Sequence, residues 1–194
     1  FVYHTSDTYL LGAGLSAYVK DKLGQQTDLF SNVLYEKIFN PLGLSQISAQ
    51  SRRTSDLNSQ PYVGYGLFFT RDDLARLSRF VSQQAEALAD SAILAKAPLQ
   101  AALQQSQKNT GLNTDYSFIR YQHGFWARKV MDENVCKDPH WIPFMSGYGG
   151  LTVALLAKSS VYYYISDSFH FDWSEAIPEL KKLDLICSDN TADT

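Results

Sequence analysis

The sequence lacks a hydrophobic run long enough to cross a lipid bilayer. A spanning helix needs about 18 or more apolar residues in succession, whereas the most apolar stretch, residues 148–156, is closely followed by Lys158. Basic residues are not in excess either, because 17 Lys and Arg stand against 20 Asp and Glu for a net charge of −3. We therefore predict no transmembrane segment and no nucleic-acid partner, since the latter would require a basic surface.

Cysteine is scarce, and short metal-binding patterns are missing. The chain has two cysteines and four histidines, with no Cys-x-x-Cys pair and none of the short histidine spacings of zinc ligands. We therefore expect no metal and no other cofactor. No Gly-x-Ser-x-Gly motif occurs, which argues against an α/β-hydrolase. Cys136 and Cys187 can form one bridge, or they can be two unrelated buried thiols.

The chain does contain enough apolar residues for a substantial core. Its 194 residues are 45% hydrophobic and 13% aromatic, values typical of a globular domain. Residues 1–116 predict mainly helices, and residues 117–194 predict antiparallel strands followed by a C-terminal helix. We interpret these two regions as parts of one α+β domain.

Two helices are expected first. Ser6 or Asp7 can cap a helix that ends at Gly24. Apolar spacing places four of its residues on one face, namely Leu11, Leu15, Tyr18 and Lys22. A second helix over about residues 27–39 has an apolar side that includes Leu29, Val33 and Ile38.

The next region alternates loop and helix. Residues 45–65 are polar and predict a loop. The pattern Thr70-x-x-Asp73 is an acidic variant of the capping box and predicts the start of a third helix. Residues 83–108 are rich in Ala and Gln and predict helix, with Pro98 marking a break or a new first turn.

Strand signals follow. Residues 121–130 predict one strand interrupted at Gly124, and residues 151–157 and 161–166 predict a hairpin. Both hairpin strands are apolar at nearly every position, which indicates a sheet covered on both faces. Because three strands and one helix are too few for that, we expect upstream residues to complete the structure. A final helix should begin at Asp172 or Ser174 and point three residues inward, namely Ala176, Leu180 and Leu183.

Six short motifs occur along the chain in a particular order. A Tyr-x-Thr segment precedes an Asp-Thr-x-Leu-Leu-Gly helix start; later come Phe-Asn-Pro-Leu-Gly, Asp-Leu-Ala-Arg, Gly-Phe-Trp and Met-Ser-Gly. In type and order they resemble the penicillin-recognising serine hydrolases, the group of serine β-lactamases, DD-peptidases and related esterases. The resemblance implies a β-lactamase/transpeptidase-like fold and hydrolysis of an amide, ester or peptide through an acyl-enzyme.

The resemblance assigns the first site residues around Tyr3. Tyr3 would be the acid/base partner of a serine nucleophile. A phenol needs positive charge nearby to act as a base, and the lysine of the family's Ser-x-x-Lys motif, which carries the nucleophile, would supply it. Thr5 would donate or accept a hydrogen bond to substrate or to that lysine, and His4 would line the substrate site.

The second group of site residues is the segment around Gly147. Ser146 and Gly147 match the family's Lys/His-Thr/Ser-Gly motif, while Met145 replaces its cation and would contact substrate together with Gly149. Gly147 would let substrate lie along the strand edge as an added strand. The backbone N–H of Tyr148 would donate to the oxyanion. We expect Tyr3 and this strand edge to border one cleft.

The family's Ser-x-x-Lys motif does not occur in these residues. The resemblance therefore implies that the chain is the C-terminal portion of an enzyme whose domain begins upstream of Phe1, so the missing segment is an expected partner. The family is exported, which implies a periplasmic or secreted location and favours a Cys136–Cys187 disulfide.

Other interpretations remain open. The replacement of the cation by Met145 also fits a non-catalytic binding or regulatory relative of the same fold. Tyr3 can be an ordinary loop tyrosine, and residues 146–150 can be a glycine-rich strand against which another element packs closely. Ser188-Asp189-Asn190 spells a β-lactamase tripeptide, which we interpret as coincidence.

Overall fold

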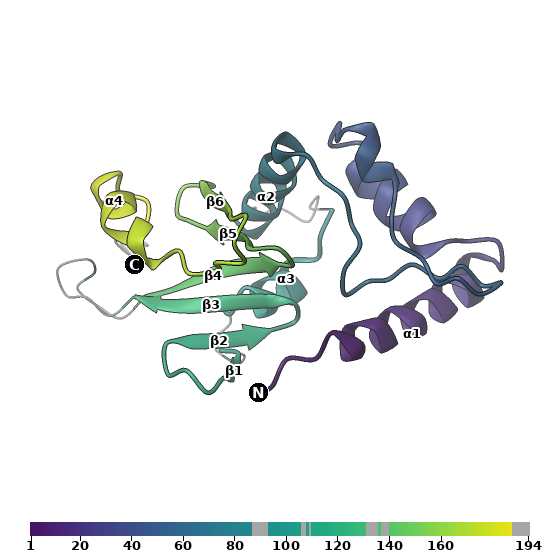
Figure 1. The fold of residues 1–194 in the computed structure, drawn as a ribbon, viewed down its shortest axis with the longest axis horizontal. Coiled ribbons are helices and arrows are strands. Elements are labelled where there is room, and N and C mark those ends of the chain that lie inside the picture. Colours follow the sequence, from purple (N-terminus) through teal and green to yellow (C-terminus); the bar gives the residue numbers. More distant parts are fainter. Residues whose placement is uncertain (87–92, 106–107, 109, 131–135, 137–139, 188–194) are drawn as a thin grey trace. The chain divides into compact units, whose positions relative to one another are not determined.

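The computed structural model describes residues 1–194 except 87–92, 106–107, 109, 131–135, 137–139 and 188–194. The chain forms two compact units: an N-terminal unit of residues 2–77 and a C-terminal unit of Phe1 and residues 78–194. Helices come first, and a six-stranded antiparallel sheet and a C-terminal helix follow (Figure 1), which confirms the α+β class. In the described parts of the chain, every helix is too short or too polar to cross a membrane.

Helix α1 (Thr5–Leu23) begins earlier than the sequence predicted. His4 occupies the capping position without a side-chain hydrogen bond, and its C=O accepts the N–H of Asp7 at 3.1 Å. Ser6 and Asp7 therefore lie in the first turn, and their prediction as caps is wrong. The predicted end is correct, because Gly24 has φ 110° and donates its N–H to the carbonyl of Lys20 at 3.1 Å.

The predicted inward face of α1 is also wrong. Leu11, Leu15 and Tyr18 are 70%, 43% and 60% exposed, whereas the buried residues of the helix are Gly12, Ser16 and Val19. A Cβ on Gly12 would lie 2.2 Å from Cγ2 of Val63. The chain around Val63 thus packs where α1 has its smallest side chains, because close approach is possible only there.

Element η1 (Leu29–Phe39) is wound as a π-helix. Asp28 caps it, accepting the N–H of Ser31 at 2.7 Å, in agreement with the predicted start. Its wider turns bury Phe30 and Phe39 and leave three predicted inward residues half-buried, namely Leu29, Val33 and Ile38. The 45–65 segment is mostly loop but contains one short 3₁₀ turn, η2 (Gln46–Ala49).

The predicted capping box opens α2 (Arg71–Glu86). The N–H of Asp73 donates to the Thr70 hydroxyl at 3.1 Å, and the N–H of Thr70 donates to the Asp73 carboxylate at 2.9 Å. Helix α3 (Lys96–Ala102) carries Pro98 in its first turn, as predicted. Part of the region 83–108 lies outside the described residues.

The sheet of the C-terminal unit has the sequential order β1-β2-β3-β4-β5-β6. Its strands are β1 (Leu112–Asn113), β2 (Ile119–Gln122), β3 (Phe125–Val130), β4 (His140–Gly147), β5 (Leu151–Leu155) and β6 (Val161–Ile165). The single interrupted strand predicted over residues 121–130 is instead the β2–β3 hairpin, turning at His123 (φ 45°) and Gly124 (φ 91°). The predicted β5–β6 hairpin is confirmed.

Both faces of the sheet are covered at its centre. Phe144 and Ala154 pair across β4 and β5 and join a core that includes Trp173. On the opposite face, Ala127 and Val153 are fully buried. The two-sided covering agrees with the prediction, but the described sheet has six strands instead of the three predicted. The expected contribution of upstream residues stays a prediction.

The chain ends in η3 (Ser174–Ala176) and α4 (Ile177–Lys182). Asp172 accepts the N–H of Ser174 at 2.9 Å, consistent with the predicted start, and forms an ion pair with Arg128 of β3 at 2.9 Å. Leu180 is buried as predicted, but Leu183 is 66% exposed because α4 ends one residue before it.

Candidate functional site

The tyrosine segment lies at the start of α1 in the N-terminal unit. Tyr3 is 40% exposed, and His4 and Thr5 are exposed at the helix start. Gly64 packs against this start, since a Cβ on it would lie 2.8 Å from the Thr5 methyl carbon and 3.1 Å from the Thr5 carbonyl oxygen. The small residue at 64 therefore lets the 61–65 loop close on the first turn of the helix that carries Thr5.

The second group of predicted site residues lies at the end of β4 in the C-terminal unit. Ser146 pairs with Thr152 of β5, and Gly147 pairs with Leu151. On the other side, the β3–β4 ladder ends at Trp126 and Phe144. Among the described residues of the C-terminal unit, Ser146 and Gly147 thus pair with a strand on one side only; we call the opposite, unpaired backbone edge the open edge.

The β3–β4 ladder ends where β3 begins, because β3 starts at Phe125 directly after the His123-Gly124 turn while β4 continues to Gly147. The Phe125 carbonyl accepts the side-chain amide of Gln104 at 3.4 Å, just beyond α3. Gln104 itself has φ 59° and packs against Gly111, whose added Cβ would lie 2.5 Å from the Gln104 oxygen. The start of β3 is thereby bonded to the segment after α3.

The turn after β4 carries Tyr148 on the surface. Tyr148 is 89% exposed, and its ring meets Phe169 edge to face at 5.3 Å. Gly149 and Gly150 have φ 94° and 89°. These positive φ values let the chain reverse from β4 into β5.

Gly150 fits the alternative interpretation of residues 146–150 as a glycine-rich strand against which another element packs closely. A Cβ there would lie 2.8 Å from Cβ of Ser166 and 3.2 Å from the backbone N and O of His170. The Ser166 hydroxyl accepts the N–H of Ser168 at 3.1 Å and that of His170 at 3.3 Å. Another backbone therefore packs closely at Gly150, as a glycine-rich strand predicts, while the edge at residues 146–147 stays open.

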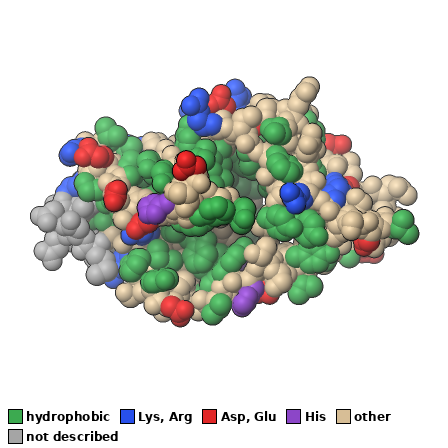
Figure 2. Space-filling view, viewed as in Figure 1, with side chains coloured by type: hydrophobic (Ala, Val, Ile, Leu, Met, Phe, Trp, Pro, Cys, Tyr) green, Lys and Arg blue, Asp and Glu red, His purple; other side chains and the backbone are tan. Residues whose placement is uncertain are grey.

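Met145 supplies no charge to this strand. It pairs with Val153 and is half-buried, on the sheet face opposite Phe144. No three His, Cys, Asp or Glu side chains of the described residues come together to hold a metal ion. On the face that Figure 2 shows, acidic and basic side chains are intermixed.

The disulfide is confirmed. Cys136 and Cys187 are bonded, with their Cα atoms 5.6 Å apart. Cys136 belongs to the core around Trp173, and Cys187 packs against that core. The bridge therefore fixes the segment before β4 to the segment after α4.

The structure brings together five of the predicted site residues, which are consecutive in the C-terminal unit: Met145, Ser146, Gly147, Tyr148 and Gly149. Tyr3, His4 and Thr5 belong to the N-terminal unit, so a cleft shared with the first group stays a prediction. Sequence reasoning missed Phe169 and Gln104. Neither residue left a sequence signal that could have identified it.

Comparison of the sequence with protein-family models gives no match, and comparison with curated proteins gives no significant match either.

Proposed function

We propose that the chain is part of a serine hydrolase of the β-lactamase and penicillin-binding type. It would act on an amide, ester or peptide carbonyl through an acyl-enzyme, with the serine nucleophile on a segment outside these 194 residues. The observation that carries the proposal is the open β4 edge at Ser146 and Gly147, next to the exposed Tyr148. An extended substrate can add to such an edge through backbone hydrogen bonds.

In this proposal each site residue has its own role in substrate binding or catalysis. Gly147 leaves room for the substrate backbone, Ser146 bonds it, and the Tyr148 N–H stabilises the oxyanion. Tyr3 transfers the proton between the nucleophile and the leaving group. Tyr148 and Phe169 offer an aromatic surface beside the edge, which favours acyl groups with apolar character. The disulfide supports an oxidising compartment, so we propose a periplasmic or secreted location.

Loss of the Tyr3 phenol tests the proposal. In the protein that includes the upstream segment, Tyr3→Phe should lower kcat/KM for a chromogenic p-nitrophenyl ester by about 10²–10⁴, the usual contribution of a general acid–base group. Tyr18→Phe, which removes an exposed phenol from the same helix, is the matched control and should leave the rate within roughly twofold. Equal rates for wild type and Tyr3→Phe would remove Tyr3 from the mechanism.

A second candidate is a non-catalytic relative that binds peptides at the same edge, favoured by the uncharged Met145. A fluorescent fluorophosphonate distinguishes the two, because it labels an activated serine covalently. Labelling of the protein that includes the upstream segment supports the hydrolase, and absence of labelling with retained peptide binding supports the second candidate.

A further inference from the structure

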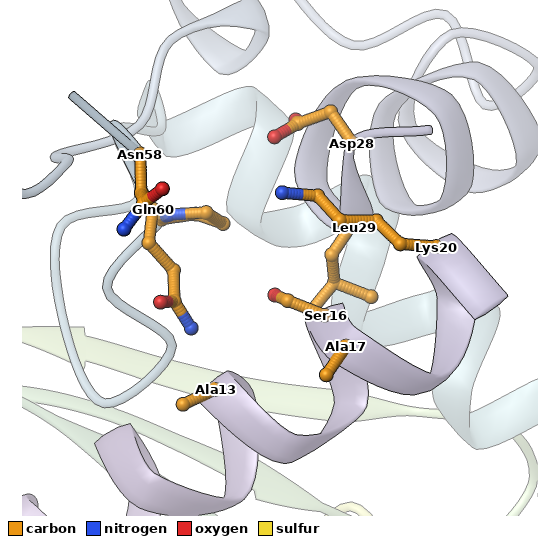
Figure 3. Close-up of a pocket in the computed structure, with 9 residues that line it drawn as sticks. Ala13, Ser16, Ala17, Lys20, Asp28, Leu29, Asn58 and Gln60 are labelled. Atoms are coloured by element: carbon orange, nitrogen blue, oxygen red, sulfur yellow. The ribbon is translucent and has the colours of Figure 1, made fainter. Parts of the chain in front are cut away.

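A cavity of about 150 Å³ lies within the N-terminal unit, away from the tyrosine segment. It is lined by α1, the beginning of η1 and residues 58–61 (Figure 3). Its polar lining consists of Ser16, Lys20, Asp28, Asn58 and Gln60, and its walls include small or apolar residues of α1 and η1. The cavity is therefore small and lined by polar groups of several kinds.

Ser16 provides the strongest sign that the cavity takes a ligand. The residue is only 7% exposed, and its hydroxyl has no hydrogen-bond partner among the described residues. In Figure 3 the hydroxyl points into the cavity. A buried hydroxyl without a partner destabilises the folded state, so a molecule that bonds it gains that energy.

The charges around the cavity leave one cation uncompensated. Both Asp28 oxygens accept from Arg53, at 2.7 and 2.8 Å, and one also accepts the N–H of Ser31. The bonds from Arg53 lower the pKa of Asp28 below its usual range, so this pair is ionised and neutral overall. Lys20 forms no ion pair with any described residue, and Figure 3 shows its amine reaching into the same space.

The opposite wall offers neutral hydrogen-bonding groups. Gln60 is half-buried, and its backbone N–H donates to Thr54 at 2.8 Å, which fixes the segment that carries its amide. Figure 3 shows Asn58 and Gln60 across the cavity from Ser16 and Lys20. An occupant thus meets a cation and a hydroxyl on one side and carboxamides, which both donate and accept, on the other.

We propose that this cavity binds a small hydroxycarboxylate. The carboxylate would pair with Lys20, the ligand hydroxyl would bond Ser16, and Gln60 would bond the remaining oxygen lone pairs. The cavity volume of about 150 Å³ favours a ligand of few atoms. Glycolate is the smallest hydroxycarboxylate and is therefore the ligand with which we test the proposal.

The test is a titration of the chain with sodium glycolate at constant ionic strength, followed by ¹H–¹⁵N NMR. We expect saturable shifts of the backbone amides of Ser16, Lys20 and Gln60 below about 100 mM, because so few atoms bind weakly. Glycolamide, the neutral isostere, should shift them far less. Shifts that do not saturate, or an equal response to glycolamide, overturn the proposal and leave water as the occupant.

Two variants separate a binding role from a structural one. Lys20→Met should weaken glycolate binding about tenfold, the loss expected for one charge-assisted hydrogen bond. Lys22→Met removes the same charge from an exposed position of the same helix and should not weaken it. Equal weakening by both variants would show only diffuse charge attraction and would overturn the site.

Ser16→Ala gives an independent test, because it should change stability and glycolate binding in opposite directions. Removing a buried, unpartnered hydroxyl should raise the midpoint of urea unfolding without ligand and should weaken glycolate binding. A variant that is less stable and binds glycolate as wild type does would contradict the role of Ser16.

Discussion

Asp73 joins two segments of the N-terminal unit through its carboxylate. The carboxylate accepts the N–H of Ser45 at 2.6 Å, the Ser45 hydroxyl, and the N–H of Thr70 at 2.9 Å, and the residue is 2% exposed. Burial raises the pKa of Asp73, but the hydrogen bonds from Ser45 and Thr70 outweigh it and lower the pKa to about 2. The ionised carboxylate therefore stabilises the fold.

Replacing Asp73 tests this role. Asp73→Ala should lower the free energy of unfolding at pH 7 by about 1–2 kcal/mol, the cost of a lost helix cap. Because the folded pKa lies below the unfolded value of about 3.9, the carboxylate's contribution is full above that value and is lost as the pH falls towards 2. Urea unfolding of both proteins between pH 7 and pH 2 should show the difference shrinking in that window.

The neighbouring Asp72 is the control for Asp73, because its side chain is 80% exposed. Asp72→Ala should change stability by less than about 0.5 kcal/mol. An equal loss from both variants, or a difference that does not depend on pH, would contradict the assignment.

Gly150 and Gly149 offer a matched pair for the close packing after β4. Both have positive φ, but a Cβ on Gly150 would meet Ser166 and His170, whereas nothing lies within 4 Å of one on Gly149. Gly149→Ala should cost about 1 kcal/mol from backbone strain, and Gly150→Ala about 1–3 kcal/mol more from overpacking. Thermal or urea unfolding measures both, and equal losses would show that the His170 segment moves aside without cost.

At the scale of single elements, the apolar pattern predicted where α1 lies but not which side is buried. Spacing arguments place the largest apolar residues inward, yet Leu11 and Tyr18 are exposed while Gly12 and Ser16 are buried. The contact depends on Val63, distant in the sequence, which needs a flat, small-residue surface. Such tertiary pairing cannot be inferred from the helix alone.

Among the turns, too, one was predicted from the sequence and another was missed. The Lys158-Ser159-Ser160 turn was predicted between two apolar strands, and the N–H of Ser160 bonds the carbonyl of Ala157 at 3.2 Å. The β2–β3 turn was missed because two-residue hairpin turns usually have the sequence Asn-Gly or Asp-Gly. Here His123 occupies the first turn position, with a left-handed φ. η1 was predicted in extent, but its π winding changes which residues face inward.

For the candidate site, the sequence predicted the small-residue strand and its close approach by another backbone. It could not predict that the β3–β4 ladder ends at Phe144, because that depends on the β2–β3 turn at His123 and Gly124, which sequence reasoning missed. It could not predict Phe169 beside Tyr148 either, since a phenylalanine with φ 58° has no reliable sequence signal.

At the scale of the whole molecule, the Cys136–Cys187 disulfide constrains the unfolded chain and can be removed by reduction or mutation. The cysteines are 51 residues apart, and closing a loop of that length stabilises by about 4 kcal/mol in the chain-entropy model. A Cys136→Ala/Cys187→Ala double variant should lose about that much in urea unfolding and become insensitive to reductant. A loss below about 1 kcal/mol would indicate that the unfolded chain is already constrained.

The positions of the two cysteines make a covalent ring out of half the C-terminal unit. Cys136 precedes β4 and Cys187 follows α4, so three strands and the terminal helix all lie inside the ring. A protease that cuts the β5–β6 turn, where Lys158 is exposed, opens the ring without releasing a fragment. The open edge of β4 and the terminal helix then remain tethered to the same core after the nick, for as long as the surroundings stay oxidising.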